Sequence, residues 1–136
     1  MKRFFILLII SILSVNCSTM KNQKTEEKDL SKKWKLVKIE NQNISVSEAI
    51  TLEINQKEGQ FSGFAGCNRI GGGFQIMGEN ISFPDVYSTL MFCEPEFMNI
   101  EDKYTSLLEK VVSFELSEKT LTLFDKNKKE ILYFEL

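Results

Sequence analysis

The chain has 136 residues, of which 43% are apolar and 26% charged, and its formal net charge is −2 at pH 7. This balance is typical of one globular domain rather than a disordered chain. The acidic balance and the lack of a basic patch argue against a nucleic-acid-binding protein. Because there is no histidine, the sequence excludes Ser-His-Asp and Cys-His catalytic arrangements and imidazole metal ligands.

Residues 1–16 have the pattern of a secretory signal peptide. Two basic residues, Lys2 and Arg3, precede an apolar run from Phe4 to Leu13. This run is shorter than the roughly 20 apolar residues of a membrane-spanning helix, and a short buried helix would show a polar face. We therefore expect an exported protein from which residues 1–16 are removed.

Cys17 ends a segment, "LSVNC", that resembles a bacterial lipoprotein box. In such a box the cysteine becomes the first mature residue and carries the lipid. Leu13 stands one position further from the cysteine than is usual, and Asn16 replaces the usual small residue. We expect lipidation of Cys17 to anchor the protein to a membrane of the cell envelope, and Ser18 is compatible with the outer membrane.

Residues 17–32 are polar and charged, with few apolar side chains. Such a segment cannot bury enough apolar surface to fold alone, so we expect a flexible tether before a domain at 33–136. Removal of residues 1–16 takes away two basic residues and no acidic one, so the net charge moves from −2 to −4.

Alternating apolar and polar residues dominate the chain from residue 34 onward, a pattern that predicts half-buried β-strands. The residues 125–129, "DKNKK", predict a hairpin loop between the last two strands. The predicted strands are 34–39, 50–54, 60–64, 73–77, 80–83, 112–116, 120–124 and 131–136.

One segment, residues 96–112, breaks this alternation. Its apolar residues fall at helical spacing, and Pro95 suits the first turn of a helix. Strands, one amphipathic helix and three more strands predict an antiparallel α+β fold. The apolar stripe consists of Ile100, Tyr104, Leu107, Leu108 and Val111.

The stretch "GFAGCNRIGGGF", residues 63–74, has three interpretations. A phosphate-binding loop is disfavoured, because neither a helix nor a lysine follows the glycines. A zinc site would need carboxylates such as Glu94 or Glu96 to complete two thiols. The third is a tight hairpin whose tip is Gly71–Gly73, the glycines allowing positive φ and close backbone approach.

Cys67 and Cys93 are the two cysteines that remain once Cys17 is lipidated. They lie 26 residues apart, so they do not form a Cys-x-x-Cys redox motif. An even number of cysteines in an exported protein favours a disulfide, with two buried free thiols as the alternative.

Several spaced motifs resemble the META domain family of HslJ-like lipoproteins. They are "WKLVKIE", "SGFAGCNRIGGGF", "YSTLMFC" and the paired segments "LTLFD" and "LYFEL". The resemblance covers residues 33–136; Leu90 departs from it, because many members have a basic residue there. The matching family positions are Gly66, Cys67, Asn68, Gly72, Phe74, Ser88, Thr89, Met91, Cys93 and Glu101.

The resemblance implies an antiparallel, partly open β-barrel with one packed helix that begins near Glu101. It also implies an exported lipoprotein without an established catalytic residue, linked in some members to heat shock or antibiotic tolerance. The family fold is said to be similar to that of secretin pilot proteins, which bind lipid or peptide in a groove. Such a likeness of fold does not determine function.

Each candidate residue also has a structural interpretation. Asn68 is expected to cap a turn rather than bind a ligand, and Arg69 to be solvated or ion-paired rather than hold an anion. Thr89 and Ser88 are expected to pack in a strand, because no base is available to make either a nucleophile. Glu101 is expected in the first helical turn, where a carboxylate suits the helix dipole.

Phe92, Phe97, Met91 and Met98 form an apolar group around Cys93 in the sequence. Such a group is more often core, but it can also line a groove for lipid or peptide.

The sequence as a whole predicts a non-enzymatic, lipid-anchored binding or stress-tolerance module. It needs no cofactor and no metal, and its partners are the membrane and an unknown protein or apolar ligand. The alternatives are a groove-type carrier of lipid or peptide and a hydrolase that uses two of Glu94, Glu96 and Glu101.

Overall fold

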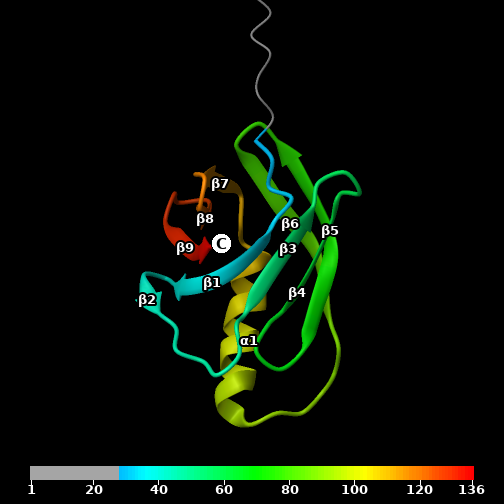
Figure 1. The fold of residues 1–136 in the computed structure, drawn as a ribbon, viewed down its shortest axis with the longest axis vertical. Coiled ribbons are helices and arrows are strands. Elements are labelled where there is room, and N and C mark those ends of the chain that lie inside the picture. Colours follow the sequence, from blue (N-terminus) through cyan, green and yellow to red (C-terminus); the bar gives the residue numbers. More distant parts are fainter. Residues whose placement is uncertain (1–27) are drawn as a thin grey trace, which may run out of the picture.

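The computed structural model describes residues 28–136, which form nine strands and one helix (Figure 1). The predicted signal peptide and Cys17 lie outside the described residues. The elements are β1 (Lys33–Ile39), β2 (Gln42–Asn43), β3 (Thr51–Asn55), β4 (Gln60–Phe64), β5 (Arg69–Met77), β6 (Asn80–Ser88), α1 (Pro95–Leu108), β7 (Ser113–Leu116), β8 (Thr120–Phe124) and β9 (Glu130–Glu135).

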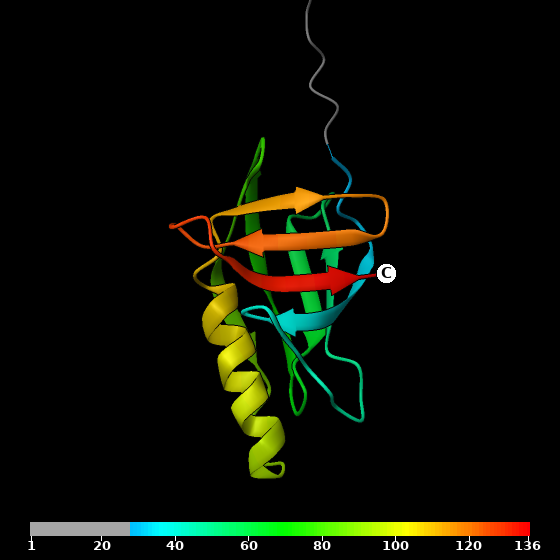
Figure 2. The same cartoon turned by 90° about the vertical axis from the view of Figure 1, so that its left-hand side faces the viewer.

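The strands form one antiparallel sheet that closes into a ring. Their order is β2-β1-β3-β4-β5-β6-β7-β8-β9, and β1 also pairs with β9. In Figure 2, β7, β8 and β9 cross the view almost horizontally, while α1 descends beside the lower part of the ring. The predicted α+β class is confirmed.

The ring is open along one seam, between β6 and β7. The only residue pair in this ladder is Asn80 with Ser113. Pro84 lies further along β6 and has no backbone N–H to donate, so it suits a strand without a neighbour on that side. The chain between β6 and β7 forms α1, which contacts β6 and β9. The predicted partly open barrel is therefore confirmed.

The alternating residues fill the interior of the ring, as the sequence pattern predicts. Trp34 of β1 is completely buried, and the ring of Phe83 packs against Phe61 by an edge contact and against Phe74 by a tilted one. The largest fully buried side chains are Trp34, Tyr104, Phe83, Phe114, Phe134, Leu30, Leu36, Ile50, Leu52, Ile81, Leu108 and Leu121.

The packed domain begins before residue 33. Leu30 is completely buried, its N–H donates to Gln56 Oε1 at 2.9 Å, and its carbonyl accepts from Trp34 Nε1 at 3.1 Å. The last residues of the segment expected to be a tether, 28–32, therefore pack against the ring.

The helix α1 begins at Pro95, as the proline suggests, and not near Glu101 as the family resemblance implies. Glu101 is thus in the second turn, too far inside to act on the helix dipole, and its side chain is buried. No helix within residues 28–136 is long and apolar enough to cross a membrane.

The three consecutive glycines do not form a hairpin tip. They lie inside β5, where Gly71 pairs with Ser62 of β4 and with Tyr87 of β6. A Cβ on Gly72 would collide with the carbonyl oxygen of Asp85, and one on Gly71 would lie 2.6 Å from Tyr87 Oη. The glycines therefore serve close approach of neighbouring strands, which is one of the two roles expected for them.

The actual turn between β4 and β5 consists of residues 65–68. Gly66 has φ 115°, a conformation that side chains strongly disfavour. The motif "AGCN" is thus the turn, and "IGGG" is strand.

Candidate functional site

A buried carboxylate connects the 65–68 turn to the helix. Glu101 of α1 is 6% exposed, and both of its oxygens accept hydrogen bonds from the turn. Oε2 accepts from the backbone N–H groups of Cys67 at 3.2 Å and Asn68 at 2.6 Å, and Oε1 accepts from Asn68 Nδ2 at 2.8 Å. Hydrogen bonds to an ionised carboxylate are stronger than neutral ones, so this contact fixes the turn on α1.

Asn68 connects the same turn to the loop 89–94. Its Oδ1 accepts from Thr89 Oγ1 at 2.8 Å and from the backbone N–H of Met91 at 2.7 Å. Its Nδ2 donates to Glu101 and also to the carbonyl oxygen of Met91, at 3.2 Å. Asn68 is 2% exposed, so it neither caps its own turn alone nor faces a ligand; it joins three segments of the chain.

A disulfide between Cys67 and Cys93 adds a covalent connection, with the two Cα atoms 5.9 Å apart. The structure thus contains the predicted bridge. It joins the turn to the residues just before α1.

The family positions of the motif fall into two groups. Gly66, Cys67, Asn68, Thr89, Cys93 and Glu101 meet at the junction of turn, loop and helix. Gly72 and Phe74 lie in β5, beside Phe61 and Phe83. Ser88 ends β6 and is exposed.

The loop 89–94 presents apolar side chains to solvent. Leu90 is 95%, Met91 54% and Phe92 97% exposed, and we call these three residues the loop patch. The prediction that Met91 and Phe92 belong to the core is wrong. The backbone of Met91 is hydrogen-bonded to the Asn68 side chain, and Cys93 is fixed by the disulfide. These two restraints hold the short segment between them at the surface, with its side chains in solvent.

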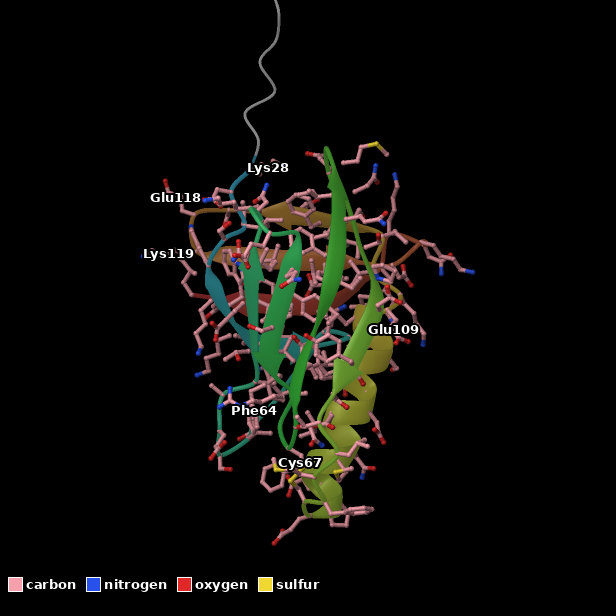
Figure 3. The ribbon with its side chains drawn as sticks, turned by 90° about the vertical axis from the view of Figure 1, so that its right-hand side faces the viewer. Lys28, Phe64, Cys67, Glu109, Glu118 and Lys119 are labelled. Carbon is pink, nitrogen blue, oxygen red and sulfur yellow. A yellow bond between two sulfur atoms is a disulfide. The ribbon has the colours of Figure 1, made fainter. Side chains whose placement is uncertain are left out.

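A hollow of about 530 Å³ adjoins the loop patch. Its apolar lining includes Phe64, Met91, Phe97 and the two disulfide cysteines (Figure 3 labels Phe64 and Cys67). Two carboxylates, Glu48 and Glu94, also line it, and no basic residue does. The sequence predicted Phe97 and Glu94 as candidates but gave no signal for Glu48 or Phe64.

The remaining candidates stand apart from this hollow or lack partners for chemistry. Glu96 is exposed in the first turn of α1, and Arg69 is exposed at the start of β5. Within residues 28–136 no three His, Cys, Asp or Glu side chains are placed to hold a metal ion. The carboxylate-assisted zinc site is therefore not assembled by the described part of the chain.

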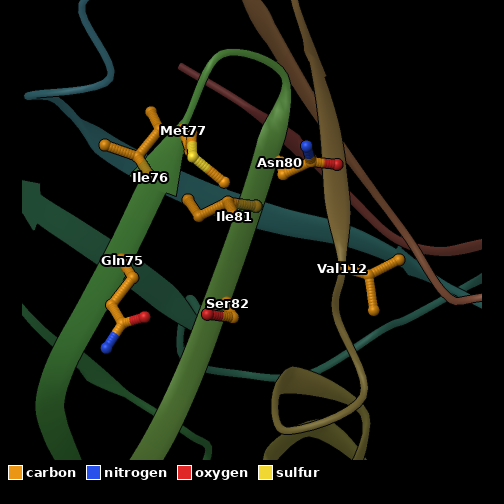
Figure 4. A pocket seen from close by; sticks show the side chains of 7 residues that line it. All are labelled: Gln75, Ile76, Met77, Asn80, Ile81, Ser82 and Val112. Carbon is orange, nitrogen blue, oxygen red and sulfur yellow. The ribbon is translucent and has the colours of Figure 1, made fainter.

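A second apolar region lies at the opposite end of the ring, where the β5–β6 hairpin turns. Met77 is 77% and Val112 41% exposed, and together with the half-buried Ile76 we call them the hairpin patch. They border a hollow of about 340 Å³ at the β6–β7 seam, and none of its lining residues is charged (Figure 4). No pattern in the sequence distinguishes this patch, because Ile76, Met77 and Val112 fall within predicted strands, whose apolar side chains are expected to face the core.

Comparisons with known proteins agree with the fold. The family model of the META domain matches residues 28–136. An NMR structure of a protein from Burkholderia xenovorans superposes with a TM-score of 0.61 at 24% identity, covering 77% of this chain and 81% of that one. A crystal structure of a DUF4847 family protein from Bacteroides vulgatus ATCC 8482 gives 0.58 at 12% identity, covering 77% and 92%. No curated protein matches the chain.

Proposed function

The chain belongs to the META domain family, and we propose that it is a non-enzymatic binding module of the cell envelope. In this proposal Cys17 carries the lipid anchor, at the outer membrane, and the loop patch docks a segment of a partner protein. The observation that carries the proposal is the near-complete exposure of Leu90 and Phe92 on a loop that is rigidly held.

Rigid support distinguishes the loop patch from an accidental exposed loop. Exposed apolar side chains on a mobile loop lose conformational entropy when they bind, which weakens the complex. Here the loop is fixed before binding by Asn68 and by the disulfide. Large apolar side chains fixed next to a hollow are the usual centre of a protein–protein interface.

The charges around the hollow indicate the kind of segment that fits. Glu48 and Glu94 line it without a basic neighbour in the lining. A segment with apolar side chains flanked by lysine or arginine would complement both the apolar surface and these carboxylates. We therefore propose a basic amphipathic segment as the partner.

The carboxylates support binding better than hydrolysis. Glu101 is 6% exposed and its carboxylate already accepts three hydrogen bonds from the turn, so it is poorly placed to exchange a proton with a substrate. Glu96 is exposed and does not line the hollow, which leaves Glu94 with Glu48 as the pair that a hydrolase would have to use.

A carrier function is the second candidate, since the hollow of about 530 Å³ has an apolar lining.

A photoreactive phenylalanine analogue at position 92, in the full chain in its native cells, tests the proposal. We expect a discrete protein adduct that disappears when Leu90→Ser removes the neighbouring side chain. The double variant Glu48→Lys with Glu94→Lys should weaken the same adduct, while Glu96→Lys should not. Lipid adducts without a protein adduct would favour the carrier instead.

The anchor has its own test. Cys17→Ala should release the protein from the membrane fraction, and the mass of the native protein should show acyl chains on Cys17. Continued membrane association of the Cys17→Ala variant would contradict the anchoring part of the proposal.

A further inference from the structure

We propose that the hairpin patch rests on the lipid bilayer to which the chain is anchored, so that the loop patch points away from that membrane. This inference rests on the anchoring at Cys17, which is part of the proposed function. The hairpin patch would then contact lipid, and the loop patch would contact the partner protein.

The described chain begins next to the β5–β6 hairpin. Lys28 Nζ lies 2.9 Å from Glu79 Oε1 at the tip of the β5–β6 hairpin, and 5.7 Å from the ring centre of Phe114. The chain therefore enters the domain beside the hairpin patch. The loop 89–94 and the start of α1 lie at the opposite end of the molecule (Figures 1 and 2).

The distance between Cys17 and the domain limits which end of the domain can approach the bilayer. Eleven residue steps separate Cys17 from Lys28, and even a fully extended chain of this length spans only about 38 Å. A domain of this size has a radius of gyration of about 13 Å, so it is about 35 Å across. The loop patch could meet the same bilayer only with these residues stretched along the side of the domain, whereas the hairpin patch can meet it without such stretching.

The charges near the two apolar regions also differ. Apolar side chains enter the headgroup and acyl boundary of a bilayer favourably, whereas a carboxylate carried in with them loses hydration. The hollow at the hairpin patch has no charged lining residue, and the neighbouring Glu79 is paired with Lys28. The hollow at the loop patch has Glu48 and Glu94 in its lining. The hairpin patch therefore suits a lipid surface better than the loop patch does.

The patch is small, so it orients the domain rather than binding it to the membrane. Met77 and Val112 contribute limited apolar area, and stable attachment of a protein to a bilayer needs more than one such contribution. The lipid anchor supplies the attachment, and the hairpin patch selects which end of the domain faces the membrane.

Tryptophan reporters in an anchored chain test the inference. The mature chain from Cys17 has one free thiol once Cys67 and Cys93 are bridged. Coupling this thiol to a maleimide lipid in phosphatidylcholine vesicles anchors the chain whether or not cells lipidate it. Met77→Trp and Val112→Trp place a tryptophan in the hairpin patch, and Phe92→Trp places one in the loop patch as the exposed control. The buried Trp34 also emits, so the emission of the unsubstituted chain is measured and subtracted.

With brominated phosphatidylcholine, we expect the emission added by Met77→Trp and by Val112→Trp to be largely quenched and blue-shifted. The emission added by Phe92→Trp should be the same in brominated as in unbrominated vesicles. Equal or stronger quenching at position 92 would overturn the inference, and so would an absence of quenching at all three positions. Because the coupling replaces native lipidation, a failure here is distinguishable from a failure of Cys17 acylation, which fractionation of the native chain measures.

Discussion

The two ends of this ring expose apolar side chains on very different supports. At the helix end, the loop patch is held by a disulfide, by the four hydrogen bonds of the Asn68 side chain and by the buried carboxylate of Glu101. At the hairpin end, Met77 lies on an ordinary two-stranded hairpin at the seam where the sheet is barely paired. A surface meant for a specific partner benefits from rigid support, whereas a surface that meets a fluid bilayer does not.

The largest difference should appear when the buried carboxylate is removed. Glu101→Ala leaves two backbone N–H groups and one N–H of Asn68 Nδ2 without their acceptor in a buried site, which we expect to lower the free energy of unfolding by about 3–4 kcal/mol. Glu96→Ala, exposed on the same helix, should change it by less than about 0.5 kcal/mol. Urea unfolding of both variants measures this, and similar values for the two would mean that the network contributes little.

Reduction of the disulfide should have the next largest effect. A loop of 26 residues closed by a disulfide contributes roughly 3 kcal/mol in the chain-entropy model. The melting temperature should therefore fall by about 10 °C or more when a reductant is added. The double variant Cys67→Ser with Cys93→Ser should melt at the reduced temperature and ignore the reductant, and its loop patch should lose protection from hydrogen exchange while the hairpin does not.

Two glycines provide a matched test of backbone strain at the two ends. Gly66 has φ 115°, outside the regions that side chains adopt, whereas Gly78 has φ 63° in the left-handed region and nothing near its missing Cβ. Gly66→Ala should cost about 2 kcal/mol and Gly78→Ala about 1 kcal/mol. Thermal unfolding would show the order, and a larger loss at Gly78 would contradict the view that the helix end is the more constrained.

The smallest effects on stability are expected at the exposed side chains themselves. Leu90→Ser with Phe92→Ser, and separately Met77→Ser, should each change the free energy of unfolding by less than about 0.5 kcal/mol. The first variant should nevertheless lose the partner adduct, and the second should lose only its preferred orientation on vesicles. A marked loss of stability in the first would show that the loop patch is part of the core.

The helix and most strands followed from local patterns in the sequence. The stripe of Tyr104, Leu107 and Leu108 is buried as predicted, and the strand 60–64 has the predicted bounds. Gly71–Gly73 misled the prediction, because glycine supports both turns and close strand packing, and only the neighbouring strands decide between them. Phe92 misled it too, because an apolar residue in a loop gives no local sign of facing solvent.

The sequence by itself determined the alternation that closes a sheet around a core and the single amphipathic helix, since these depend on residue type and spacing along the chain. Only the tertiary structure decided that Asn68 and Glu101, 33 residues apart, share a buried set of hydrogen bonds. It also decided that the loop 89–94, which exposes Leu90, and the β5–β6 hairpin, which exposes Met77, lie at opposite ends of the molecule. Contacts and exposure of this kind arise when distant segments pack together, so no local pattern of residues contains them.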